Sequence, residues 1–184
     1  IAGSGRVELE ARAAEWFETA ARVATGFAAW ASARDLAARA LELTGAGGVD
    51  RARRLQLLGR ATANAAGVDE ALPLLEESLA AYRSLGADAP RSGVADAACA
   101  VGRQLRAQAR FSVTQELADE LLQELGEQDD AATARLLALR GYGALSAWDD
   151  FAGARADAER ALELARGSDD PDAELEALQL LTAC

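Results

Sequence analysis

The chain has 184 residues, of which 51% are hydrophobic and only 5% aromatic, so alanine and leucine must provide most of the packing. A formal net charge of -11 excludes a general surface for nucleic acids or anionic membranes, because both need clustered cations. Histidine and lysine are absent, which excludes histidine-based catalytic and metal sites and a Walker-type phosphate loop. We therefore expect no catalysis by this chain, no metal site and no cofactor.

Apolar residues recur at helical spacing along the whole chain, and glycine or proline interrupts this pattern at short intervals. About a quarter of the residues are alanine, the strongest helix former. The pattern predicts an all-α fold of nine helices, in chain order at residues 6–25, 29–44, 50–65, 69–85, 91–108, 112–126, 130–147, 150–166 and 172–184.

Several residues predict where these helices begin and end. Glycine tolerates the left-handed conformation that closes a helix, so helix ends are expected at Gly45–Gly48, Gly67, Gly86, Gly126 and Gly167. Helix starts are expected at Asp50, Asp69, Ser112, Asp150 and Pro171. Three aspartate pairs, at 129–130, 149–150 and 169–170, fall beside predicted starts, where carboxylates interact favourably with free amides. We favour this role for the pairs over metal binding.

The second helices of successive predicted pairs have similar sequences. The similar segments are AARALELTG at 37–45, LLEESLAAYRSLG at 74–86, LADELLQELG at 117–126 and AERALELARG at 158–167. Their spacing of roughly 38 to 43 residues is typical of helical arrays.

These repeats resemble those of tetratricopeptide arrays. The clearest match lies in residues 52–85, where a leucine followed by glycine in the first helix precedes small residues in the second: Leu55, Leu58, Gly59, Ala71, Leu75 and Ser78. The resemblance implies a right-handed α-solenoid of antiparallel helix pairs, in which small residues let paired helices approach closely. It implies about four and a half repeats, at 14–47, 52–85, 95–128, 135–168 and, as a half repeat, 172–184.

Repeats of about forty residues are similar, more narrowly, to the sensor arrays of large bacterial regulators. In such proteins an ATP-binding module precedes the helical repeats, and a helix-turn-helix or nucleotide-cyclase domain lies elsewhere. The chain lacks an initiator methionine and ends within a predicted helix, so we expect it to be part of a longer protein. With only two cysteines and no predicted membrane helix, a reducing bacterial cytoplasm is the expected location.

In such a solenoid the first helices line a concave face. That geometry selects seven candidate residues for ligand or partner binding: Arg22, Arg53, Gln56, Arg60, Asn64, Arg103 and Arg106. It also places on this face Glu18, Asp96, Cys99, Leu136, Leu139, Gly143 and Ser146. Guanidinium groups bind carboxylates and phosphates bidentately, so the face could hold an anion. The alternative is that these arginines pair with nearby acids on solvated helix faces.

The tryptophans and Cys99 have structural interpretations. Trp16, Trp30 and Trp148 are expected to fill gaps between helices, with Trp148 alternatively an exposed anchor for a partner. Cys99 is expected to be a small buried residue rather than a reactive thiol.

The leading functional hypothesis is a non-catalytic module of a cytoplasmic bacterial regulator that binds a protein, a peptide segment or a small anionic effector. The alternative is a structural spacer or oligomerisation element without a ligand. The half repeat favours self-association, because Leu175, Leu178 and Leu181 need another helix to cover them.

Overall fold

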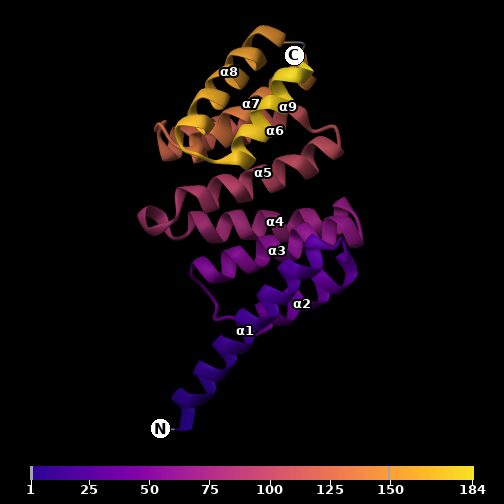
Figure 1. Cartoon of the computed structure of the whole chain (residues 1–184), viewed down its shortest axis with the longest axis vertical. Helices are drawn as coiled ribbons and strands as arrows, with labels where there is room; N and C mark the ends of the chain where they lie inside the picture. The colour runs from indigo at the N-terminus through magenta and orange to yellow at the C-terminus, as the bar shows by residue number, and fades with distance from the viewer. Residues whose placement is uncertain (1, 149) are drawn as a thin grey trace. The chain divides into compact units, whose positions relative to one another are not determined.

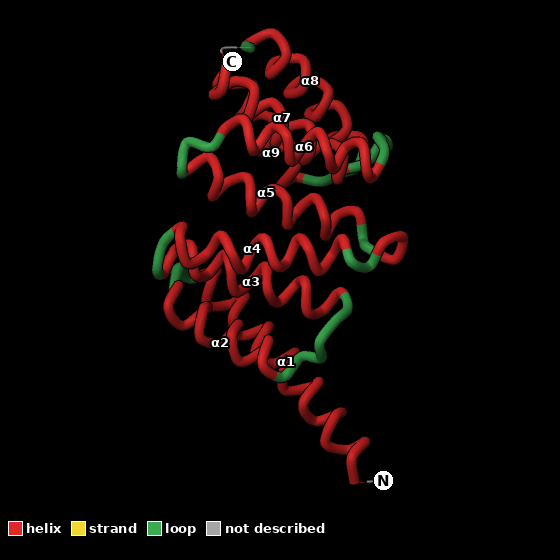
Figure 2. Tube along the Cα trace, turned by 180° about the vertical axis from the view of Figure 1, so that it is seen from behind, coloured by secondary structure: helices red, strands yellow, loops and turns green. Residues whose placement is uncertain are grey.

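The computed structural model describes residues 2–148 and 150–184, with side chains except at 2–4 and 146–148. Within these ranges the protein is all-α, with nine α-helices, one short 3-10 helix and no strand (Figures 1 and 2). The predicted all-α class and the predicted order of the helices are thereby confirmed for the described residues.

The chain divides into two compact units, at residues 1–90 and 91–184. The N-terminal unit contains α1 (Ala2–Gly26), α2 (Trp30–Glu42), α3 (Val49–Ala65), α4 (Val68–Arg83) and the 3-10 helix η1 (Gly86–Asp88). The C-terminal unit contains α5 (Arg91–Ala107), α6 (Phe111–Leu125), α7 (Ala131–Trp148), α8 (Phe151–Gly167) and α9 (Pro171–Ala183).

Consecutive helices pack against each other within each unit. In the N-terminal unit α1 packs on α2, α2 on α3 and α3 on α4 (Figure 1). In the C-terminal unit α7 contacts all four other helices. A helix with neighbours on every side needs apolar residues around its whole circumference, and the α7 segment AATARLLALRGYGALSAW has this composition.

Alanine and glycine allow these helices to approach closely. Ala14 and Ala21 of α1 and Ala33 and Ala37 of α2 are completely buried. In α7, a methyl group added at Gly143 would lie 2.8 Å from the backbone nitrogen of Gln115 in α6. Such a distance is shorter than any normal contact, so the two backbones are in direct contact at this glycine.

Aspartates cap the last three helices through the same hydrogen bond. Asp130, Asp150 and Asp170 each accept a bond from the backbone N–H three residues later, at 2.8, 2.9 and 3.0 Å. This confirms the helix-start role for the second aspartate of each pair. The described residues contain no cluster suited to a metal ion, and Asp149 lies outside them.

The turns differ in detail from the predictions. Left-handed backbone occurs at Ala28, Ala109 and Asp169, where no glycine indicated it. The α8 helix therefore closes at Asp169, with a φ of 54°, rather than through a left-handed Gly167. The predicted cap at Ser112 is also wrong, because α6 begins one residue earlier and Arg110 occupies the capping position without a side-chain bond.

Trp16 does not fill a gap between helices, contrary to expectation. Its residue surface is 75% exposed, because it lies on the side of α1 opposite the buried Ala14 and Ala21. Trp30 is half-buried, and the side chain of Trp148 lies outside the described residues.

No helix in the described part of the chain has the length and apolar character needed to cross a bilayer.

The direct contact at Gly143 predicts that Gly143→Ala lowers the free energy of unfolding by about 1–3 kcal/mol, despite the better helix propensity of alanine. Urea denaturation followed by circular dichroism measures this change. Gly47→Ala is the matched control, because a methyl group there meets no atom within 4 Å. Equal unfolding midpoints for the two variants would contradict the packing described for α6 and α7.

Candidate functional site

A buried carboxylate organises the N-terminal unit. Glu18 of α1 is only 6% exposed and accepts hydrogen bonds from three arginines. Arg22 donates at 2.9 Å, and Arg53 of α3 donates at 2.7 and 3.0 Å to the two carboxylate oxygens. Arg54 donates from Nε at 3.0 Å and from Nη1 to Thr44 Oγ1 at 2.6 Å. The cluster thus joins α1 to α3 and to the end of α2.

The arginines keep Glu18 ionised. Burial by itself raises its pKa, but the hydrogen bonds from Arg53, Arg22 and Arg54 outweigh this effect and lower the pKa to about 2. The same pairing raises the pKa of Arg53. Three guanidinium groups around one carboxylate leave this region positively charged, although Asp50 also pairs with Arg53 at 2.9 Å.

A hollow of about 330 Å³ lies beside this cluster. Its lining residues come from the end of α1 and the middle of α3: Arg22, Thr25, Gly26, Arg53, Gln56, Leu57 and Arg60. The volume is at the lower end of the range for ligand pockets. The hollow therefore brings together four of the five candidate residues predicted in this unit.

Asn64, the fifth candidate, is not among the lining residues of this hollow. It is exposed, and its side-chain amide donates to the carbonyl oxygen of Arg60 at 3.0 Å. Its local hydrogen bond is within α3 and gives it no special position toward a ligand.

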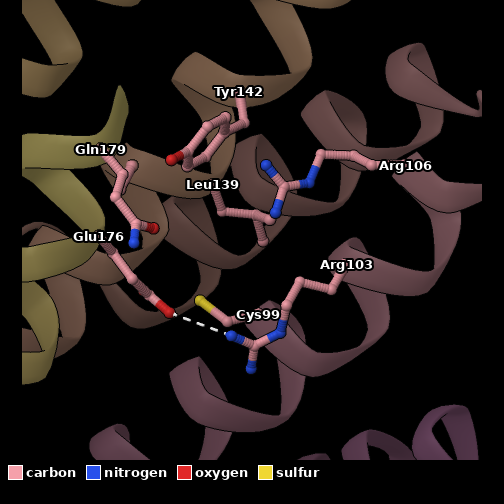
Figure 3. A pocket seen from close by; sticks show the side chains of 8 residues that line it. Cys99, Arg103, Arg106, Leu139, Tyr142, Glu176 and Gln179 are labelled. Atoms are coloured by element: carbon pink, nitrogen blue, oxygen red, sulfur yellow. Dashed lines mark hydrogen bonds and ion pairs between the residues drawn. The ribbon is translucent and has the colours of Figure 1, made fainter. Parts of the chain in front are cut away.

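A second, smaller pocket of about 80 Å³ lies in the C-terminal unit. Figure 3 shows Arg103 and Arg106 extending from α5 towards Tyr142 of α7 and towards Glu176 and Gln179 of α9. Cys99, Ala138 and Leu139 complete the lining. Both candidate arginines of this unit therefore line one pocket.

The charged groups of the second pocket are incompletely paired. Arg103 donates to Glu176 at 3.5 Å, a long distance for a charge-assisted hydrogen bond. The guanidinium carbon of Arg106 lies 4.1 Å from the centre of the Tyr142 ring. The Nε of Arg106 is buried and has no hydrogen-bond partner among the described residues.

Burial shifts the protonation equilibria of this pocket. It raises the pKa of Glu176 and of Tyr142 and lowers the pKa of Arg106, whose charge is further disfavoured by Arg103. Burial also raises the pKa of Cys99, so its thiol remains protonated. The expectation that Cys99 is buried is confirmed.

Four other residues expected to be exposed on the concave face are buried instead. Glu18 and Leu136 are buried rather than exposed, because Glu18 pairs with α3 and Leu136 packs in the interior of its unit. Gly143 is covered by Gln115. Leu139 is also buried, although it contributes to the wall of the second pocket, and the side chain of Ser146 lies outside the described residues.

The residues of these sites that the sequence did not predict include Arg54, Tyr142, Glu176 and Gln179. Glu18 and Arg22 are four residues apart, a spacing at which ion pairs form within a helix, but nothing local indicates that Arg53 and Arg54 join them. Glu176 and Gln179 are three residues apart, which places them on one side of α9.

The alternative that the candidate arginines pair with acids holds for Arg53, which pairs with Glu18 and Asp50, and for Arg103, which pairs with Glu176. Other arginines pair with acids as well. Arg135 contacts Asp96 and bonds to Asp170 at 3.0 Å, and Arg140 bonds to Asp157 at 2.6 and 2.8 Å. These pairs cross between helices instead of lying along one solvated face. The two pockets differ from them because each holds more guanidinium groups than carboxylates.

Compared with models of known protein families, the chain matches none, and a search of the curated proteins finds no match either. The resemblance to tetratricopeptide arrays thus depends on the repeat pattern, together with the packing of consecutive helices in each unit.

The low pKa of Glu18 predicts a specific pH dependence of stability. Because the folded-state pKa of about 2 lies below the ordinary value of 4.5, the stabilisation by ionised Glu18 is complete above pH 4.5 and is lost as the pH falls towards 2. We expect Glu18→Gln to lower the free energy of unfolding by about 2 kcal/mol at neutral pH. The difference from wild type should shrink below pH 4.5.

Urea denaturation at a series of pH values measures this difference. Glu42→Gln provides the control, because Glu42 is exposed and pairs with Arg39 on the same helix, so its loss should cost less than about 1 kcal/mol. A difference between wild type and Glu18→Gln that is constant with pH would contradict the role given to the Glu18 charge.

Proposed function

We propose that this chain is a non-catalytic binding module that recognises an acidic peptide or protein segment through the hollow of the N-terminal unit. The supporting observation is the meeting of Arg22, Arg53 and Arg60 around a hollow of about 330 Å³. A positively charged hollow on a chain with a net charge of -11 attracts an acidic ligand locally while the remaining surface repels it. The position of a bound acidic segment along the chain would therefore be set by the contact of its acidic residues with this hollow.

The lining of the hollow suits side chains that combine charge with apolar surface. Leu57, Gly26 and the aliphatic stems of the arginines provide apolar contact area. Gln56 is nearly buried at the same place and adds hydrogen-bonding capacity beside the guanidinium groups. Alternating acidic and apolar residues would satisfy both features.

The Glu18 cluster supports this function by restricting the arginines. Arg53 uses both Nε and Nη2 to hold Glu18, which fixes the plane of its guanidinium group. A restricted cation loses less conformational entropy when a ligand binds. We propose that Glu18 acts as a positioning residue beneath the site.

For the chain as a whole, we propose a right-handed array of tetratricopeptide-like repeats. We further propose that it serves as a sensor or scaffold in a cytoplasmic bacterial regulator, whose ATP-binding module would lie elsewhere in the longer protein. The packing of consecutive helices in each unit supports the array.

A fluorescein-labelled peptide of alternating glutamate and leucine tests the N-terminal site. We expect Arg60→Glu to weaken its binding about tenfold or more in fluorescence anisotropy, because a like charge replaces an attractive one. Arg39→Glu has the same charge change in the same unit but is on α2, and it should bind like wild type. Equal affinity of the Arg60→Glu and Arg39→Glu variants would overturn the proposal, as would equal binding of a peptide with glutamine in place of glutamate.

Exposed apolar residues favour self-association as a second candidate function. Along α1 and the turn after it, Leu9, Trp16, Val23 and Phe27 are exposed, and the first three are spaced seven residues apart, which places them on one side of the helix. On α9, Leu175 and Leu178 are exposed as well. A second copy of the chain would cover these residues.

Sedimentation velocity over a range of protein concentrations tests this second candidate. We expect a concentration-dependent increase in sedimentation coefficient that Trp16→Glu removes. A wild-type chain that sediments as a monomer at every concentration would rule out this function and leave the binding proposal unaffected.

A further inference from the structure

We propose that α1 pairs with α1 of a second copy of this chain in antiparallel orientation, so that Trp16 of each copy packs against Ala20 of the other. This inference rests on the self-association proposed above and specifies its interface. It does not depend on peptide binding by the N-terminal hollow.

The N-terminal turns of α1 lie outside the packed part of their unit. The helix α1 spans 25 residues, whereas α2, which packs against it, spans 13. Figures 1 and 2 both show these turns extending beyond the other helices of the unit, and residues 5–9, 11 and 12 are exposed. Because helices in proteins gain most of their stability from packing, a helix laid along this extension would stabilise it.

An apolar stripe runs along the exposed side of α1. Its members, at alternating intervals of four and three residues, are Leu9, Ala13, Trp16, Ala20, Val23 and Phe27. This spacing is typical of the seam between two paired helices. Trp16 and Phe27 are 75% and 82% exposed, so the two largest side chains of the stripe are open to a partner. Phe27 continues the stripe past the end of α1, because its backbone N–H donates to the carbonyl oxygen of Val23 at 3.2 Å.

The order of large and small residues makes the stripe complementary to itself in one orientation. When two copies run in opposite directions and cross at position 18, the layers are Trp16 on Ala20, Val23 on Ala13 and Leu9 on Phe27. Large side chains then meet alanine in the central layers. A parallel pair would place Trp16 on Trp16 and Ala20 on Ala20, which crowds one layer and leaves a gap in the other. The stripe therefore favours a second, antiparallel copy as its occupant.

The position of the stripe and the charge of α1 both permit this pairing. Ala14 and Ala21 are completely buried on the side of α1 opposite Trp16, so the remainder of each copy lies away from the paired helices. The helix contains three arginines and four glutamates, a net charge of -1, whereas the chain carries -11. Two copies thus meet where the local repulsion between them is small.

Disulfide cross-linking tests the orientation. The variants Leu9→Cys and Phe27→Cys are each made together with Cys184→Ser, because Cys184 is exposed whereas Cys99 is buried. In the antiparallel pair positions 9 and 27 face each other, while the two copies of position 9 are about 27 Å apart at 1.5 Å per residue. We expect a mixture of the two variants, oxidised with diamide, to give at least about tenfold more linked dimer than either variant alone.

A matched control accounts for cross-linking by random collision. Val49→Cys, also made with Cys184→Ser, places an exposed thiol at the start of α3 in the same unit, away from the stripe. Mixed with Leu9→Cys, it should give no more linked dimer than either variant alone. All mixtures are oxidised at a protein concentration where the wild-type chain sediments as a dimer.

Exchanging residue size between positions 16 and 20 tests the central layers. Trp16→Ala leaves alanine on alanine, and Ala20→Trp places tryptophan on tryptophan, so each variant alone should dimerise about tenfold more weakly than wild type. An equimolar mixture of the two restores tryptophan on alanine in both layers and should dimerise like wild type. Both positions are exposed in the single chain, so its thermal unfolding should be unchanged.

Each contrary outcome removes a different part of the proposal. A wild-type chain that is monomeric at every concentration would overturn this inference together with self-association. A dimer that persists in Trp16→Glu would overturn the α1 interface and leave self-association through another surface. Efficient cross-linking of Leu9→Cys with itself would overturn the antiparallel orientation. A mixture of Trp16→Ala and Ala20→Trp that dimerises no better than either variant alone would overturn the packing of Trp16 on Ala20.

Discussion

The structure depends on the close approach of helices that bury alanine and glycine instead of large side chains. With Ala14, Ala21, Ala33 and Ala37 completely buried, α1 and α2 leave no room for a long side chain between them. In α7, Gly143 brings two backbones into direct contact. Long side chains must then extend past the edges of the helix contacts, where they reach neighbouring helices. The charged network and both pockets follow from this constraint.

Arginine is suited to the edges of the helix contacts, because its planar guanidinium group can donate to two acceptors at once. Arg91 illustrates the effect, since it donates to the carbonyl oxygens of Leu125 and Gly126 at the end of α6 and to Asp130 at the start of α7. Asp170 combines two roles in the same way, because it caps α9 and accepts from Arg135 of α7. Helix termini and helix packing are therefore stabilised by the same residues.

The arginines of the two pockets differ in how closely they are paired with acids. In the N-terminal unit the arginines converge on buried Glu18, which satisfies and orients them beside an open hollow. In the C-terminal unit the acid is distant at 3.5 Å, and the Nε of Arg106 is left without an acceptor among the described residues. The first arrangement is the basis of the proposal that a larger ligand binds at the surface of the N-terminal unit.

The helical class and nearly every helix span followed from the sequence, because helical periodicity and capping residues act over only a few positions. Asp130, Asp150 and Asp170 were predictable as helix starts for this reason, and Arg53, Gln56 and Arg60 shared one face of α3 because helical spacing placed them there. Trp16, by contrast, could not be placed, because its exposure depends on which side of α1 other helices cover.

Which acids the arginines meet depends on the packing of helices that are far apart in the sequence. Glu18 is 35 residues from Arg53, and Arg103 is 73 residues from Glu176. A guanidinium group on a flexible stem can reach several neighbours, so its partner depends on which helix lies alongside it and not on its own local sequence. For the same reason, the burial of Glu18 became apparent only once α3 lay beside α1. The same holds for the Nε of Arg106, which has no partner in the described part of the chain.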